Sequence, residues 1–509
     1  MSVSADLILK NATVIAMDSD IEEVKKKTSI AVKDGNIMNV GSESEIMALE
    51  ANNTKLLDLD GYVVLPGFVD SHVHLIMTGL QSSEVNLRDC RSIDDILDKL
   101  EIESKKESGW VIGRGFDDSK LADKRFPNKS DLDKVLPEQP VYLQRIDNNL
   151  TVLNTAALNE VEIDKDTRGV DIASDGTMSG IMTADAHYYI RKQVFELIPT
   201  ERKVQAIKEA CKNAACKGIT TVHAIEYPWD IERVRALVDD LPINVQFYCR
   251  SPVIKDAVSL GLKGAAGDVN LDGSLGAYTA ALSKPYHDKP DQKGLLYLTQ
   301  EEVNQIVLEA NKENCQIALH AIGDRAIEQV INAFEAGLEQ VPNKNHRHRI
   351  EHYSLPNQDQ IKRTAQLGIY LSMSPAFEYH FGWDQMYGNR LGPERVRNMH
   401  PFRDIIDEGI AVAANSDSPV TPMNPLVNLQ SAVARPCEDQ RISVYEALKM
   451  LTINGALIGF EEQQRGSIRE GKKADFVVLD NNPFEAQLDK IIDMKIKYTI
   501  SNGNIVYSS

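Results

Sequence analysis

The sequence predicts an α/β protein built on a (β/α)8 TIM barrel, with a small composite β-sandwich from both termini and an α/β insertion after barrel strand one. Three observations predict this fold. Apolar, β-rich runs alternate with helical patterns along the chain, as in parallel strands joined by crossover helices. Short alternating strands stand at both chain ends. A long segment separates the first apolar run from the second, and it exceeds what a plain crossover needs.

The two parts of the expected sandwich are residues 1–66 and 456–509. Both contain short strands with alternating apolar and polar residues, and Asp34-Gly35 is a hairpin turn signal. If these fragments pair in one sheet structure, the termini lie together. The strands are expected at 6–10, 29–33, 36–40, 62–65, 475–479, 497–500 and 504–507.

The barrel is expected in residues 67–79 and 206–455, and the insertion in residues 80–205. Strand-like segments and polar turns within the insertion predict an α/β cap beside the barrel mouth. Eight parallel strands favour a closed barrel, in which reactive residues lie at the C-terminal ends of the strands. The barrel strands are expected at 68–75, 219–225, 243–249, 265–271, 316–321, 349–353, 369–373 and 410–414.

The charge of the chain excludes several partners. Lys and Arg number 56 against 75 Asp and Glu, a net charge of −19, which is the wrong sign for binding phosphates of nucleic acid or an anionic membrane. The N-terminal residues lack the basic and apolar regions of a signal peptide, and no run of about 18 apolar residues could span a membrane. The expected location is cytoplasmic, where the six scattered cysteines stay reduced.

A metal site is indicated first by His72 and His74, which lie two apart on a predicted strand and project from the same face. Two imidazoles suit zinc and similar ions. Three further residues fall at the ends of later strands: His320, His352 and Asp417. A lone histidine at a strand end is more often structural, and Asp417 could initiate a turn. Their convergence on one rim of the barrel favours a metal centre.

The motifs around these residues resemble the amidohydrolase superfamily, and within it the amidohydrolase-3 group that includes YtcJ-like metal-dependent hydrolases. The resemblance spans nearly the whole chain. It rests on Leu65-Pro-Gly-Phe-Val-Asp-Ser-His-Val-His74, Leu271-Asp-Gly-Ser-Leu-Gly276 with Thr279-Ala280, His320-Ala-Ile-Gly-Asp-Arg-Ala326, Arg349-Ile-Glu-His352, Ser416-Asp-Ser-Pro419 and Gly471-Lys-Lys-Ala-Asp475.

The resemblance implies roles for the five residues. His72, His74, His320 and His352 would be ligands of a divalent metal, with zinc the preferred ion and one or two ions in the site. Asp417 would lie at the metal and its water, and would act as the catalytic proton shuttle between the water and the leaving nitrogen. The terminal β fragments would form the composite sandwich of such enzymes.

Two positions depart from the family pattern. Asp268 stands where many relatives have a lysine that bridges two metals, so Asp268 is a further candidate ligand and the number of metal ions stays open. In the insertion, Asp147-Asn148-Asn149 replaces the relatives' Asp-Gly-His, which predicts a different substrate preference.

Candidate substrate-binding residues are Arg145, His223, Tyr379 and Trp383. Arg145 could hold a carboxylate or carbonyl of the substrate, or serve as an internal ion-pair partner. His223 ends the second strand and could reach the metal or the substrate. The alternative is a structural role, or one in which it supports the metal ligands. Tyr379 and Trp383 follow strand seven, where aromatic side chains could wall a pocket.

These residues lead to a hydrolase in which a metal-activated water cleaves a C–N bond, amide or N-acyl, of a small organic substrate. Ester or lactone hydrolysis on the same site is an alternative, because fold and ligands do not determine the scissile bond. A non-catalytic binding or regulatory barrel is the alternative from another class of protein. The expected partners are a small-molecule substrate and, in a homodimer, a second copy of the chain.

Overall fold

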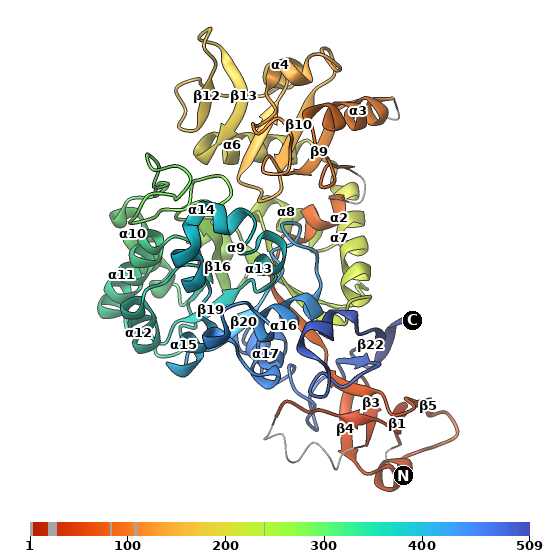
Figure 1. Ribbon diagram of the computed structural model, residues 1–509. Coiled ribbons are helices and arrows are strands. Elements are labelled where there is room, and N and C mark those ends of the chain that lie inside the picture. Colours follow the sequence, from red (N-terminus) through yellow and green to blue (C-terminus); the bar gives the residue numbers. More distant parts are fainter. Residues whose placement is uncertain (1–3, 19–27, 82–83, 106–108, 239) are drawn as a thin grey trace.

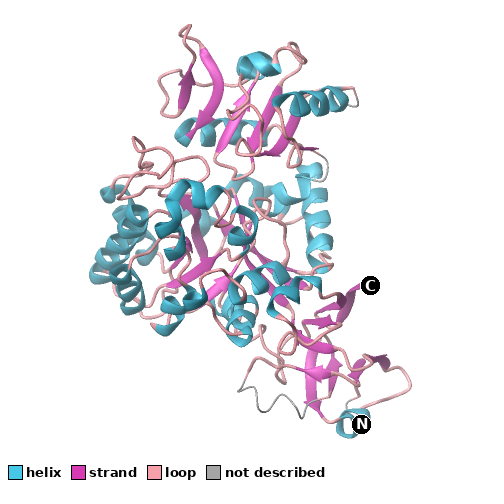
Figure 2. Ribbon diagram, viewed as in Figure 1, coloured by secondary structure: helices cyan, strands magenta, loops and turns pink. Residues whose placement is uncertain are grey.

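A computed structural model describes residues 4–18, 28–81, 84–105, 109–238 and 240–509 (Figure 1). Residues 1–3, 19–27, 82–83, 106–108 and 239 lie outside the described residues. The structure therefore describes only the remaining parts of the predicted segments that contain them. Three regions follow one another in space: the terminal sheets, a central body of strands surrounded by helices, and the insertion at the far end (Figures 1 and 2).

The central body contains eight strands that run parallel to their hydrogen-bonded neighbours, each within two or three residues of its predicted position. They form two sheets in the orders β15-β14-β7 and β16-β17-β18-β19-β20, and an isolated parallel bridge joins Val73 to Ser418. Among the described residues no backbone ladder joins β15 to β16, so the hydrogen bonding does not form one continuous ring. The strands are β7 (Phe68–Val73), β14 (Ile219–Glu226), β15 (Asn244–Cys249), β16 (Gly264–Asn270), β17 (Gln316–Ala321), β18 (Arg349–His352), β19 (Tyr370–Met373) and β20 (Val412–Ala414).

Helices surround these strands because each helix has one apolar face, which is buried against the strands. Figure 2 shows them around the central strands. They are α2 (Leu75–Leu80), α7 (Thr200–Ala215), α8 (Pro228–Val234), α9 (Ile254–Ser259), α10 (Gln300–Lys312), α11 (Asp324–Gln340), α12 (Gln358–Gln366), α13 (Ala376–Phe381), α14 (Met386–Arg395), α15 (Phe402–Asp407), α16 (Pro425–Val433), α17 (Val444–Leu451) and α18 (Ile453–Ile458).

The longest of these helices, α11, shows how the core stabilises the fold. Phe334 on α11 is fully buried in the main hydrophobic core. Phe334→Ala leaves a cavity and is expected to lower the free energy of unfolding by about 3–5 kcal/mol. Exposed Glu339 on the same helix is the control, because Glu339→Ala removes no buried surface. Denaturant unfolding measures both changes, and a loss below about 1 kcal/mol for Phe334→Ala would contradict this packing.

Strands from the two chain ends share one sheet. Its order is β2-β6-β21-β22-β23, and β6 pairs antiparallel with β21, Val64 opposite Val478. A second sheet, β4-β3-β1-β5, shares an apolar core with it. Strands β3 and β22, from the two ends of the chain, lie at the same end of the molecule (Figure 1). The elements are β1 (Leu7–Lys10), β2 (Thr13–Val14), β3 (Ser29–Lys33), β4 (Asn36–Gly41), α1 (Glu43–Met47), β5 (Lys55–Asp58), β6 (Val63–Pro66), β21 (Phe476–Leu479), β22 (Ile496–Ser501) and β23 (Asn504–Ser508).

The insertion forms a mixed sheet in the order β12-β13-β11-β10-β9-β8. It lies beyond the central strands, on the side away from the termini (Figure 1). Its elements are β8 (Val85–Asn86), α3 (Ile93–Ser104), β9 (Val111–Phe116), α4 (Lys129–Leu132), β10 (Val141–Arg145), β11 (Leu150–Leu153), α5 (Thr155–Glu160), β12 (Val170–Ile172), β13 (Met178–Thr183) and α6 (Ala184–Glu196). No helix among the described residues has the length and apolar character to cross a membrane.

Candidate metal centre

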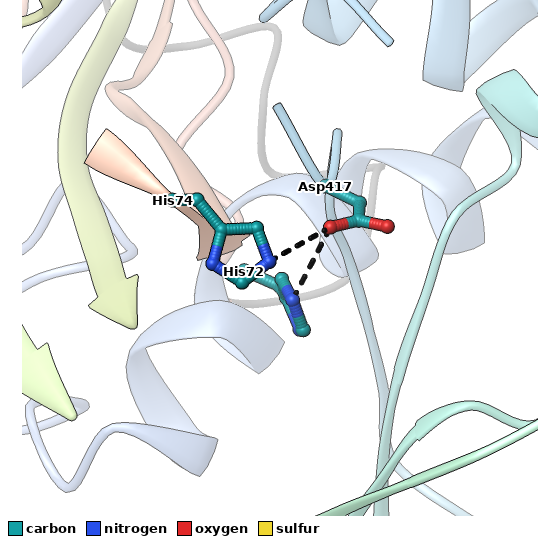
Figure 3. A group of neighbouring side chains, drawn as sticks. All are labelled: His72, His74 and Asp417. Carbon is teal, nitrogen blue, oxygen red and sulfur yellow. Dashed lines mark ion pairs between the residues drawn. The ribbon is translucent and has the colours of Figure 1, made fainter. Parts of the chain in front are cut away.

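The structure brings the predicted metal-site residues together at the C-terminal ends of the central strands. His72 and His74 lie at the end of β7, and Asp417 follows β20. The Nε2 atoms of His72 and His74 lie 3.3 and 3.4 Å from Oδ1 of Asp417 (Figure 3). All three side chains are buried. They therefore present two imidazole nitrogens and one carboxylate oxygen to a common point.

Asp268 joins this group from the opposite side. Its Oδ1 lies 4.0 Å from Nε2 of His72 and 3.8 Å from Nε2 of His352, while its Oδ2 lies 3.5 Å from Nε2 of His74. Two sets of donor atoms result, His72 with His74 and Asp417, and His72 with Asp268 and His352, and within each set the atoms lie within 4.8 Å of one another. The Nε2 of His72 belongs to both sets.

His320 is near the centre, but its ring is engaged on both sides. Nδ1 lies 3.1 Å from Oδ1 of Asp268, and Nε2 lies 3.1 Å from the carbonyl oxygen of Gly273. Burial lowers the pKa of His320, but the Asp268 carboxylate outweighs it and the net pKa is raised. With both nitrogens facing acceptors, His320 offers no lone pair until it loses a proton. It accordingly belongs to neither donor set.

The backbone holds three of these side chains in strained positions. Asp268, His352 and Asp417 have φ angles of 52°, 70° and 51°, in the left-handed region that non-glycine residues seldom adopt. Asp268 also lies where the pairing of β16 with β17 changes register, at a bulge that directs the side chain out of the ladder. Strain of this kind persists where the surrounding structure imposes it, which is typical of functional sites.

Glu351 fixes the orientation of His72, a role the sequence analysis did not assign. His72 Nδ1 donates to Oε2 of Glu351 at 2.6 Å, and Arg349 Nε donates to the other carboxylate oxygen at 2.5 Å. All three side chains are fully buried. The contact turns Nε2 of His72 toward the centre, the arrangement by which a carboxylate orients a metal-binding histidine. His74 is held likewise, because its Nδ1 lies 3.2 Å from the carbonyl of Ile225.

The buried carboxylates and imidazoles of the centre shift one another's pKa values. Burial raises the pKa of the Asp417 carboxyl, but the histidines beside it more than reverse this and hold it well below its usual range. Burial lowers the pKa of His72, yet Asp417 and Glu351 raise it to about 10, so this ring, like that of His320, must lose a proton before its Nε2 can bind a metal. Burial brings the pKa of His74 down to about 4, so its imidazole is neutral and free to bind a metal.

A divalent cation fits these residues. The Nε2 atom of His72 is buried and makes no hydrogen bond. A buried polar atom without a partner is costly, which a ligand bond relieves. Imidazole nitrogens with carboxylate oxygens are the donor set of zinc and related ions.

Two of the predicted substrate-binding residues, Arg145 and His223, lie in buried polar networks. Arg145 is fully buried and forms ion pairs with Asp118 at 2.7 Å and Asp147 at 2.8 Å, so its guanidinium is already paired inside the protein. His223 is fully buried behind the centre, and its Nδ1 accepts a hydrogen bond from Arg349 at 3.1 Å. It therefore touches the network that orients His72 rather than the metal-facing atoms.

The aromatic segment after the seventh strand begins with a helix, α13. Tyr379 on this helix is 51% exposed. Trp383 follows it and packs against an apolar cluster. Members of that cluster, Phe377, Phe381 and Tyr387, line a narrow cavity of about 30 Å³ that also touches His352 and Asp417. The aromatic wall is thus present, but its residues are neighbours of the predicted ones.

Parallel strands ringed by helices, with a buried cluster of imidazoles and carboxylates at the strand ends, define a TIM-barrel-type metal-dependent hydrolase. The chain belongs to the Amidohydrolase family, whose sequence pattern matches residues 55–507. The family predicted from the motifs is confirmed.

Individual relatives agree with this assignment. YtcJ of Bacillus subtilis (strain 168), named as an amidohydrolase, is 32% identical over 96% of this chain and 97% of its own. The N-substituted formamide deformylase of Arthrobacter pascens is 27% identical, covering 100% of this chain and 99% of its own. The crystal structure of an uncharacterized metal-dependent hydrolase from Pyrococcus horikoshii OT3 superposes with a TM-score of 0.77, at 27% identity over 95% of this chain and 99% of the other.

Proposed function

We propose that this hydrolase cleaves a carbon–nitrogen bond, amide or N-acyl, in a small organic substrate. The observation that carries the proposal is the buried Nε2 of His72, which has no hydrogen-bond partner although it lies amid carboxylates at the strand ends. Two relatives whose names denote C–N chemistry support it: the formamide deformylase and, over 94% of this chain at 21% identity, the imidazolonepropionase of Streptococcus sanguinis (strain SK36).

In this proposal His72, His74, His352 and Asp417 hold a divalent ion, with zinc the preferred metal. Asp268 and His320 complete the surroundings, and one or two ions are compatible with the two donor sets. The eight strands form a closed barrel in residues 67–79 and 206–455, capped by 80–205, while 1–66 and 456–509 form the composite sandwich. The protein works in the cytoplasm on a small molecule, without nucleic acid or membrane, and forms a homodimer.

A bound divalent ion supplies Lewis-acid activation of water and of the substrate carbonyl. The protein's own groups handle the protons. Asp417 is a buried carboxylate whose low pKa keeps it ionised, so it can accept a proton from the water and pass it to the leaving nitrogen. Glu351 holds His72 in place throughout. The narrow cavity lined by Phe377, Phe381 and Tyr387 leaves little room for water on that side of the centre.

Metal removal tests the proposal. We expect protein stripped with a chelator to lose at least about tenfold of its turnover of N-substituted formamides and N-acyl amines, because the general-base contribution of Asp417 depends on an activated water. Readdition of zinc restores it. Matching esters in the same panel separate C–N from C–O cleavage. Stripped protein with full activity would exclude a metal-dependent reaction, and turnover of the esters without turnover of any amide would favour the ester alternative.

A further inference from the structure

A wide cavity adjoins the metal centre on the side of the insertion. It has a volume of about 380 Å³ and lies between helix α6 and the ends of β15 and β16. Four tyrosines line it, Tyr188 and Tyr189 from α6 and Tyr227 and Tyr297 from the barrel loops, together with Arg250 and Asp268. Asp268 is also a member of the metal centre. The cavity therefore leads from the surface to the reacting groups.

The tyrosine rings are held in place by their neighbours. Tyr188 meets Tyr297 edge to face, with ring centroids 6.1 Å apart. The guanidinium of Arg250 lies 5.8 Å from the ring centre of Tyr188 and 5.5 Å from that of Tyr227. The Tyr188 hydroxyl donates to Oδ1 of Asn149 at 3.1 Å, and Asn149 is one of the residues that depart from the family pattern. The walls are thus preformed aromatic surfaces.

Two ion pairs and the ammonium of Lys192 border the cavity. Arg250 Nη2 lies 2.8 Å from Oδ2 of Asp268, and both side chains are buried. At the mouth, Asp185 is paired with Arg168 at 2.7 Å. A cationic ligand would have to break one of these pairs to find a carboxylate, whereas a neutral ring would leave both pairs intact. The ammonium of Lys192, 4.8 Å from the centre of the Trp229 ring, also borders the cavity. A cavity of roughly 150 Å³ already holds benzene, so the volume allows a ring and a linker.

The opposite side of the metal centre is much narrower. The cavity lined by Phe377, Phe381 and Tyr387 measures about 30 Å³. A small cavity of about 20 Å³ that touches Arg250, Asp268, His352 and Asp417 lies between the two. The space around the centre is therefore asymmetric, with one small and one large side.

We propose that the tyrosine-lined cavity is the subsite for an aromatic group carried on one side of the scissile bond, with a small group on the other side. This deepens the proposed function and rests on it. Tyr188 is a specificity-determining residue, because its ring lines the cavity beside Arg250 and its hydroxyl is held by Asn149. Edge-to-face contacts favour an aromatic ring over a saturated ring of the same shape.

Equilibrium binding tests the subsite without turnover. The probes are two isomeric amides, N-phenethylacetamide and N-ethyl phenylacetamide, each beside its cyclohexyl analogue and beside N-ethylacetamide. Calorimetry is run on zinc-supplemented Asp417→Asn protein, which holds the probes intact. We expect at least one phenyl probe to bind about three- to tenfold more tightly than its cyclohexyl analogue, and N-ethylacetamide to bind weakest.

Variants locate the contact. In the same background, Tyr188→Ala is expected to weaken the phenyl probe about tenfold and abolish the preference over cyclohexyl, while Tyr188→Phe keeps the ring and most of the affinity. Tyr62→Ala, in the terminal sheets, is the control that leaves binding unchanged. Thermal unfolding verifies that each variant is folded.

The outcomes separate this inference from the proposed function. Phenyl preference that depends on Tyr188, in a protein that hydrolyses no amide of the panel, would support the subsite and overturn the C–N activity. Amide hydrolysis with equal affinity for phenyl, cyclohexyl and N-ethyl probes, or with a preference that survives Tyr188→Ala, would overturn the subsite. Binding of none of the probes would overturn it as well.

Discussion

Asp417→Asn is expected to lower kcat by roughly 10²–10⁴-fold, the range by which a positioned general acid or base accelerates a reaction. Asparagine keeps the size of the side chain and an oxygen that can face the Nε2 atoms of His72 and His74, which lie 3.3 and 3.4 Å from the present carboxylate. It cannot accept a proton at neutral pH. The loss should therefore appear in kcat, with a KM and a metal content close to those of the parent protein.

The matched control is Asp359→Asn on α12, an exposed aspartate outside the centre. The same chemical change there is expected to leave kcat within about twofold of the parent value, as for most exposed positions. Steady-state kinetics measures kcat and KM of both variants, and elemental analysis measures their metal content. If the Asp417→Asn protein keeps the full kcat, Asp417 does not transfer the proton. If the variant has lost its metal, the main role of Asp417 is that of a metal ligand.

The central strands could be predicted from the sequence because buried parallel strands are continuous apolar runs. Residues 316–321 illustrate this, since the predicted strand and β17 coincide. Closure of the ring is harder to predict, because it depends on the meeting of β15 with β16. Neither strand carries a local signal for its neighbour, and the structure forms two hydrogen-bonded sheets.

Some of the side chains that face the metal centre can be predicted from the sequence. The two-residue spacing of His72 and His74 directs both rings to one face, whatever the rest of the fold. Asp268 was identified by its place before the Asp272 motif, and the structure shows it within 4.0 Å of His72 Nε2. The local bulge that directs its carboxylate inward has no sequence signal of its own.

The supporting contacts could not be predicted, because they join distant parts of the chain. Glu351 touches His72 across 279 positions of sequence. The aromatic residues near the centre show the same limit. Tyr379 was expected at the pocket from its place after strand seven, yet its side chain is half exposed. Tyr188, from the insertion, lines the wide cavity instead, because α6 packs over the ends of the barrel strands.

His72→Ala is expected to weaken metal binding by at least about 100-fold. The replacement removes the only nitrogen that belongs to both donor sets, so neither set keeps three members. Changes to the outer partners of a ligand already cost about 10–100-fold in metal affinity, and loss of the ligand itself should cost more. His287→Ala, at an exposed histidine outside the centre, is the control and should bind metal like the parent.

Glu351→Gln is expected to have an intermediate effect. It leaves the His72 ring in place and replaces the hydrogen bond to a charged carboxylate with a weaker one to a neutral amide. If His72 is a ligand oriented by Glu351, affinity measured by competition with a chelator dye should fall in the order parent, Glu351→Gln, His72→Ala. Loss of thermal stability without that order would mean that the buried Arg349–Glu351–His72 network serves the fold alone. If His72→Ala binds metal as tightly as the parent protein, His72 is not a ligand and the metal is held by the remaining donors, His74, His352, Asp268 and Asp417.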